Sequence, residues 1–134
     1  MRAYFIETRS IQLEIMKMNF SETAEFQKNF KRLGKKYRSL PDDLLEFKKV
    51  VAELPLGGGK HFVILHNQGG IKVVKARFFC RYLKGSSLRV IYAYLEKDAA
   101  IDFIEIYFKG EQTGENKLLI KNYLKKLNER PLSS

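Results

Sequence analysis

The chain has 134 residues, of which 45% are hydrophobic, and its 25 Lys and Arg against 15 Asp and Glu give a formal net charge of +10. This composition predicts one folded domain and excludes a disordered chain, while the single Cys80 excludes an internal disulfide and a cysteine-based zinc site. No apolar run approaches the roughly 18 residues of a membrane span, and none resembles a signal peptide. We therefore expect a cytoplasmic protein with no membrane partner, whose basic charge favours nucleic acid, and next an acidic protein, as its partner.

The two ends of the chain are predicted to lie outside the domain. Residues 1–10 show no periodicity and predict a leader or an extra edge strand, although Met16 and Met18 leave open that translation begins later. Residues 130–134 are expected to fray. Residues 11–129 then form a single domain.

The first half of this domain predicts a strand followed by two helices. Apolar residues alternate over 11–20, as in a strand. Ser21 is expected to cap a helix, whose apolar positions recur at helical spacing and are Phe26, Phe30, Leu33 and Tyr37. A second helix is predicted to begin at Ser39, with Pro41 in its first turn, and to end before Pro55. Two helices joined by a short linker form an antiparallel hairpin that can cover one face of a sheet.

The second half predicts a loop, three strands and a helix. Residues 56–70 hold five glycines and both histidines, and they predict a loop with at most a short extended piece at 62–65. Three apolar-alternating segments follow, and the polar turns between them predict an antiparallel meander with one solvated face. These segments are 71–79, 88–95 and 101–109. A terminal helix is expected within 114–129.

Side chains of a strand point alternately to the two faces of a sheet, so each of these strands has one nearly uniform apolar face. Strict alternation places Ile104 with the apolar residues of the third strand and Phe103 on its opposite side. If the apolar faces cover one core, the uncovered face carries Lys75, Arg77, Arg89, Glu105, Tyr107 and Lys109. Residues 54–95 contain no Asp or Glu, so a polyanion is expected to meet this sheet and the loop before it.

Short segments recur in the order and spacing of a known group of proteins. These segments are FQKNFKRL at 26–33, LPDD at 40–43, VKAR at 74–77, LRVIYAY at 88–94 and FIEIYFKG at 103–110. With the element order, they resemble the RelE/ParE superfamily of bacterial toxins over residues 11–124. The resemblance implies an α+β fold, β-α-α-β-β-β(-α), whose antiparallel twisted sheet has a helical hairpin packed on one face. It also implies the toxin of a type II toxin-antitoxin system, which a cognate antitoxin neutralises by covering the open face or displacing a helix.

The resemblance further implies a site. Superfamily members with RNase activity cut mRNA on the ribosome, using cations on the open sheet face and no metal or other cofactor. Lys75 and Arg77 match the basic pair of the second strand. Arg89 matches the arginine of the third strand, and Lys109 lies near the basic position that closes the fourth. The chain has no clear match to the C-terminal tyrosine of the RelE pattern, and its last basic position is a lysine followed by Gly110, so the resemblance does not identify the proton donor and acceptor.

The chemistry of RNA cleavage suggests roles for the same residues. Cleavage of RNA by its own 2′-oxygen needs a proton acceptor, a proton donor and positive charge at the phosphoryl oxygens. Arg77 and Arg89 suit the last role, because a guanidinium contacts phosphate in bidentate fashion and stays protonated. Lys75 or Lys109 could accept a proton, since neighbouring cations favour a neutral amine. The alternative proton carriers are Glu105 and Tyr107, of which the phenol could instead stack on a base.

The sequence also predicts residues that bind RNA around the site, and it leaves alternative functions open. The residues expected to bind RNA around the site are Lys72, Arg81, Lys84 and His66. His61 and His66 lack ligand-spaced partners for a metal, and the glycine run before Lys60 lacks the spacing of a phosphate-binding P-loop. Three alternatives stay open: a plain solvated sheet face, a ParE-like toxin that inhibits gyrase by binding it, and a degenerate member that only binds RNA. Cations at one parity on several strands favour the endoribonuclease.

Overall fold

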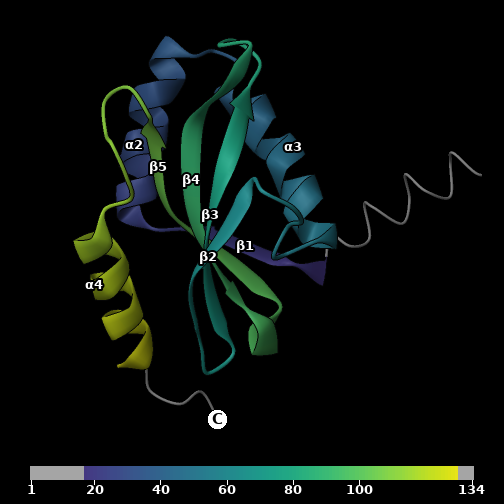
Figure 1. Cartoon of the computed structure of the whole chain (residues 1–134), viewed down its shortest axis with the longest axis vertical. Helices are drawn as coiled ribbons and strands as arrows, with labels where there is room; N and C mark the ends of the chain where they lie inside the picture. The colour runs from purple at the N-terminus through teal and green to yellow at the C-terminus, as the bar shows by residue number, and fades with distance from the viewer. Residues whose placement is uncertain (1–16, 130–134) are drawn as a thin grey trace, which may run out of the picture.

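The computed structural model describes residues 17–129, so the expectations for 1–10 and 130–134, and for the first part of the strand expected over 11–20, lie outside the described residues. Within residues 17–129, five strands and three α-helices follow in chain order (Figure 1). They are β1 (Asn19–Glu22), α2 (Ala24–Lys36), α3 (Leu40–Glu53), β2 (Phe62–Gln68), β3 (Ile71–Cys80), β4 (Gly85–Leu95), the 3-10 helix η1 (Glu96–Asp98), β5 (Ala100–Phe108) and α4 (Lys117–Asn128). No helix in the described part of the chain is long and apolar enough to cross a membrane.

The strands form one sheet in the order β1-β5-β4-β3-β2. The four strands β2 to β5 make an antiparallel meander, and β1 pairs in parallel with β5 at the far edge. The meander thus has one strand more than the sequence predicts, because much of the expected loop at 56–70 is the edge strand β2. Gly69 and Gly70, both with positive φ (62° and 80°), make the tight turn that folds this segment back onto β3.

The first helix begins two residues later than expected. Ser21 was the predicted cap, but it lies within β1, where its hydroxyl donates a hydrogen bond to the Asp102 carboxylate. Thr23 is the N-cap instead, and its hydroxyl oxygen accepts a hydrogen bond from the Phe26 N–H at 3.1 Å. The second helix begins as predicted, with Ser39 at the cap. The parallel pairing with β5 therefore extends the strand past the predicted helix start.

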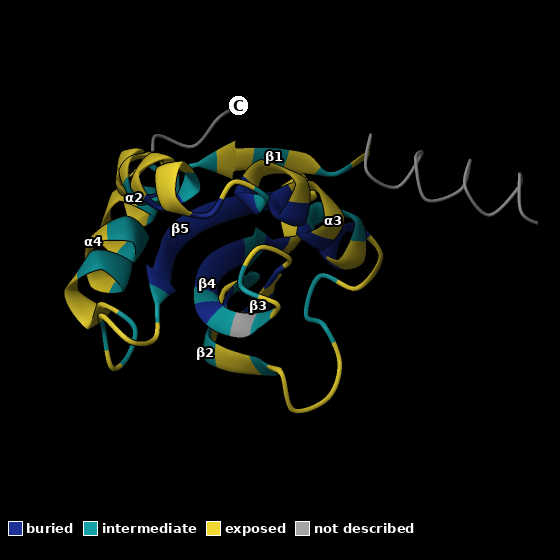
Figure 2. Ribbon diagram, turned by 90° about the horizontal axis from the view of Figure 1, so that it is seen from above, coloured by how far each residue is buried: buried dark blue, intermediate teal, exposed yellow. Residues whose placement is uncertain are grey.

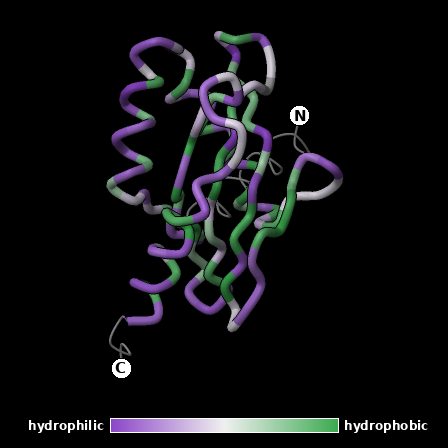
Figure 3. The backbone as a smooth tube through the Cα atoms, turned by 60° about the vertical axis from the view of Figure 1, so that its left-hand side comes forward, coloured by the Kyte–Doolittle hydropathy of each residue, from purple (hydrophilic) through white to green (hydrophobic). Residues whose placement is uncertain are grey.

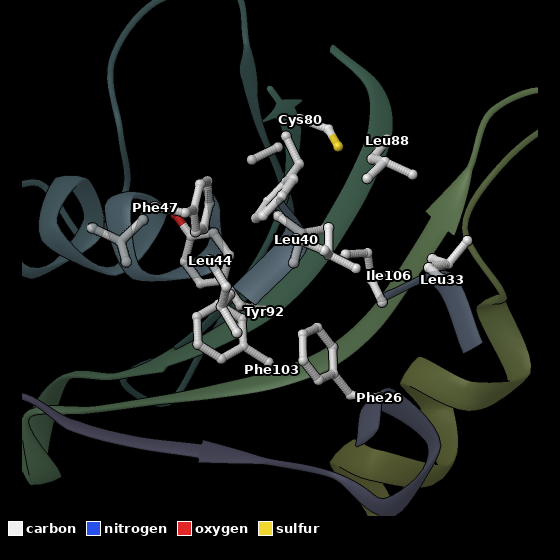
Figure 4. Packing of buried hydrophobic residues seen from close by; sticks show 14 of the residues in the cluster. Phe26, Leu33, Leu40, Leu44, Phe47, Cys80, Leu88, Tyr92, Phe103 and Ile106 are labelled. Carbon is white, nitrogen blue, oxygen red and sulfur yellow. The ribbon is translucent and has the colours of Figure 1, made fainter. Parts of the chain in front are cut away.

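The helical hairpin α2–α3 covers one face of the sheet and buries the main core against it (Figure 4). Phe47 of α3 lies at the centre of this core, with its ring centroid 5.4 Å from that of Phe78 and 5.9 Å from that of Tyr92. The Tyr92 hydroxyl donates a hydrogen bond to the Pro55 carbonyl at 2.7 Å, and burial raises the pKa of this tyrosine well above its ordinary value. Hydrophobic positions recur among hydrophilic ones along the helices (Figure 3), as amphipathic helices on a sheet require.

A β-bulge overturns the strict alternation expected in β5. Ile91 of β4 pairs with Glu105, whereas the next residue, Tyr92, pairs with Phe103, so Ile104 is an extra residue in the ladder. Phe103 consequently belongs to the helix-covered core, fully buried, while Ile104 points to the opposite face. The prediction for these two residues is wrong, because a bulge shifts every side chain before it by one position.

The opposite face is not open along its whole length, which corrects the expectation of an uncovered side. Helix α4 lies beside the beginning of β5 (Figure 1) and covers a second apolar cluster. From the sheet this cluster takes Val73, Ile91, Ala93, Leu95, Ile104 and Tyr107, and from α4 Leu119, Ile120, Tyr123, Leu124 and Leu127. Figure 2 shows β4 and β5 as the buried centre of the sheet, with β2 exposed at its edge. Only the part of this face beyond α4 remains accessible.

Candidate functional site

Three polar side chains form a row across the accessible part of the sheet. Arg77 of β3 is the direct partner of Arg89 on β4, which is in turn the direct partner of Tyr107 on β5. Like charges directly opposite each other on neighbouring strands destabilise a sheet. Two opposed guanidiniums are therefore a cost to the fold, and they favour an anionic ligand between them.

This row lies in a cleft of about 260 Å³. The cations that line it are Lys60, Lys75, Arg77, Arg89 and Lys109, and the other lining residues are His61, Val63, Ala76, Tyr107 and Thr113. Helix α4, as described over Lys117–Asn128, contributes no lining residue. The structure thus brings together five of the six residues expected on the open face.

The sixth, Glu105, shares that side of the sheet but is only 3% exposed and does not line the cleft. One of its carboxylate oxygens accepts a hydrogen bond from the Gln112 side chain and the other from the Asn116 backbone N–H, both at 2.9 Å. Segment 109–116, which leads from β5 to α4, covers it. Its expected exposure is wrong, and its contacts hold that segment and the start of α4 in place.

A carboxylate that sequence reasoning missed enters the site from this segment. Glu115 accepts a hydrogen bond from the Lys75 ammonium at 2.9 Å, and this bond is the main reason that the pKa of Glu115 is lowered. The pair occupies the Lys75 ammonium, so a phosphate must displace Glu115 to reach it. Nothing in the sequence near Glu115 indicates this fold-back, which depends on the contacts of Glu105. Lys60 and His61, by contrast, lie in the acid-free stretch 54–95, which is the signal that could have found them.

Tyr107 is 5% exposed and reaches the cleft from β5. Burial is the main cause that raises the pKa of this phenol; the Glu115 and Glu105 carboxylates raise it further, and the Arg89 guanidinium lowers it. The phenol therefore keeps its proton at neutral pH. A phenol in this environment is neutral and is a weaker acid than an ordinary tyrosine.

The four residues expected to bind RNA lie away from the cleft. Lys72 pairs with Glu96 of η1, and His66 lies in β2 beside an irregularity of its pairing with β3. Arg81 and Lys84 lie in the turn between β3 and β4, where Arg81 lines a different groove, between α3 and β3. None of the four lines the cleft, so any contact they make with RNA would be peripheral to it.

The Glu115–Lys75 pair predicts a pH dependence of stability. Because the pKa of Glu115 is lowered in the folded chain, its contribution is present above the ordinary carboxyl pKa and is lost as the pH falls through the folded value. Both side chains are partly exposed, so we expect Glu115→Gln to lower the free energy of unfolding at pH 7 by about 0.2–1 kcal/mol. Urea unfolding at pH 7 and at pH 3 measures this, and the difference from wild type should be smaller at pH 3 than at pH 7.

Glu46→Gln is the matched control, because Glu46 pairs with Lys49 at 3.0 Å on the exposed surface of α3. It should change the free energy of unfolding less than Glu115→Gln does at pH 7. A Glu115→Gln variant that loses the same stability at both pH values would show that the pair does not supply the effect.

The sequence and the fold of this chain can be compared with those of known proteins. No protein-family model matches the chain, and no curated protein matches it. Among solved structures, a chain of the archaeal RelE–RelB complex from Pyrococcus horikoshii OT3 is 21% identical, and the match covers 72% of this chain and 99% of that chain with a TM-score of 0.55. At this identity the likeness shows the fold, and it confirms the predicted RelE-like α+β architecture.

Proposed function

We propose that this chain is the toxin of a type II toxin-antitoxin system, and that it is an endoribonuclease that cuts mRNA on the ribosome in the cytoplasm. The observation that carries the proposal is the cleft, in which five cations and a protonated phenol surround a space for a phosphodiester. The RelE-like fold supports it, and the RelE–RelB complex of Pyrococcus horikoshii supports an antitoxin as the protein partner. A gyrase-binding protein has no need of this set of side chains.

The proposed reaction is attack by the RNA 2′-oxygen on the adjacent phosphorus. The bond from phosphorus to the 5′-oxygen breaks, which leaves a 2′,3′-cyclic phosphate and a 5′-hydroxyl. Arg77, Arg89 and Lys109 offset the charge that builds on the phosphoryl oxygens, without a metal. Such charge stabilisation is usually the largest single contribution to catalysis.

Two protons move in this scheme. Tyr107 gives its proton to the departing 5′-oxygen, because its phenol lines the cleft and is protonated at neutral pH. The 2′-hydroxyl loses its proton to the Glu115 carboxylate, which contacts the cleft residue Lys75 and, like any ordinary carboxylate, is ionised at neutral pH. Glu105 acts as a positioning residue, because it holds segment 109–116 through Gln112 and Asn116.

The test is mapping of transcript 5′ ends after brief induction in cells, with wild type beside the double variant Lys75→Ala, Arg89→Ala. We expect new ends inside translated frames with the wild type only. Growth arrest without new ends would instead support a gyrase-binding toxin. Induction with neither effect would leave a degenerate RNA-binding protein, and in both cases the nuclease proposal falls.

A further inference from the structure

A second depression lies next to the cationic cleft, between α3 and the end of β3. It has a volume of about 430 Å³, within the range of about 300–1,000 Å³ common for small-ligand sites, and its walls are mainly apolar. Phe79 of β3 and Val50 of α3 line it and are 60% and 47% exposed. We call this depression the α3–β3 groove. Large apolar side chains exposed together commonly mark a binding site.

The groove exists because β2 is shorter than β3. The pairing of these two strands ends at Phe62 and Ala76, so β3 continues beyond its neighbour and the groove lies along this extension. Packing holds the inner wall of the groove in place, because the Phe62 ring stacks on the Phe47 ring, with centroids 6.4 Å apart and planes 17° apart. Gly57 adopts φ +64° close to Phe62, where any added Cβ would lie 2.2 Å from the ring. The aromatic surface is therefore formed before a ligand arrives.

The groove and the cationic cleft are neighbours that share two residues. His61 and Arg77 line both of them. A strand of RNA with one phosphate in the cleft thus has a nucleotide next to the groove. This continuity connects the apolar surface with a polyanion.

We infer that the α3–β3 groove binds a nucleobase of the RNA strand whose phosphate lies in the cationic cleft, an inference that rests on the proposed endoribonuclease function. Unpaired bases of single-stranded RNA stack on aromatic side chains, which Phe79 and Phe62 supply here. The groove also contains Glu46, whose exposed carboxylate can accept a hydrogen bond from the exocyclic amino group of a base. Asp43 is buried, and its carboxylate already accepts hydrogen bonds from the Ser39 hydroxyl and the Arg81 backbone N–H. Its mainly apolar walls therefore suit the flat face of a base, with Glu46 placed to bind an amino group on its edge.

The test measures the dissociation constant of non-cleavable 2′-O-methyl RNA oligonucleotides by fluorescence anisotropy, with a series in which each position in turn is abasic. Phe79→Ala is expected to weaken binding of the intact oligonucleotide about 5- to 150-fold, the range for loss of one base–aromatic stack. With the oligonucleotide abasic at the stacked position, wild type and Phe79→Ala should bind equally. Arg89→Ala, which alters only the cleft, should weaken binding of both oligonucleotides by the same factor.

The matched control is Leu118→Ala, since Leu118 is 64% exposed on α4 and lines neither depression. It should bind every oligonucleotide like wild type. If Phe79→Ala binds the whole series like wild type while RNA cleavage persists, the inference is overturned and the nuclease proposal stands. The inference also falls if Phe79→Ala weakens only the complex with the antitoxin, which would make the groove a protein-docking surface. If wild type neither binds nor cleaves RNA, both proposals fall.

Discussion

Arg77→Ala is expected to slow RNA cleavage about 100- to 1,000-fold, the loss typical for one group that stabilises transition-state charge. Arg77 is exposed, lines the cleft from β3 and directly opposes Arg89. Within residues 17–129 no ion pair of its guanidinium is found, so the side chain is available to a phosphate. Because the substitution also relieves repulsion between two opposed cations, the free energy of unfolding should stay the same or rise slightly.

The measurements are single-turnover cleavage of mRNA bound to ribosomes and urea unfolding of the same preparation. Lys31→Ala is the matched control, because it removes one positive charge from the exposed surface of α2. Lys31 does not line the cleft. It should change neither quantity beyond about 0.5 kcal/mol equivalent, as surface substitutions usually do. Equal losses of cleavage in the two variants would mean that net charge, and not the placement of Arg77, governs the reaction. Loss of stability in Arg77→Ala would contradict the argument from repulsion.

The row of Arg77, Arg89 and Tyr107 was open to prediction because it depends only on local alternation within three strands. The residues directly before and after each of them are apolar, and no irregularity of the strand pairing lies between their positions. Parity therefore placed them on one face before any pairing was known. The element order could be predicted for the same reason, since helix spacing and strand alternation are local signals.

The parts that could not be predicted depend on contacts between distant residues. The bulge at Ile104 is fixed by how β5 pairs with β4. Residues 101–108 contain no glycine or proline that would indicate a bulge in the sequence. Glu105 was expected in solvent because its cover, segment 109–116, folds back only through hydrogen bonds formed in the complete fold. Glu115 reaches Lys75 as a consequence of that fold-back. The unexpected residues of the site are therefore those positioned by tertiary structure and not by a local pattern.

Phe103→Ala tests the consequence of the bulge that matters most for stability. The Phe103 side chain is fully buried between the helical hairpin and the sheet, with its ring centroid 5.3 Å from that of Phe26 and 6.3 Å from those of Phe47 and Tyr92. Removing a buried phenyl ring costs about 3–5 kcal/mol, through lost burial and the cavity that remains. A domain of this size has a free energy of unfolding of about 5–15 kcal/mol, so a large share of it should disappear.

The measurement is the urea midpoint and slope of Phe103→Ala against Phe79→Ala, which removes the same ring from a side chain that is 60% exposed. We expect the urea midpoint of Phe103→Ala to fall strongly with an unchanged slope. Phe79→Ala should change the free energy of unfolding by about 0.5 kcal/mol or less. If β5 alternated strictly, Phe103 would lie on the α4 side of the sheet, outside the contacts with Phe26 and Phe47. Equal and small losses in the two variants would support that strict register and contradict the bulge at Ile104.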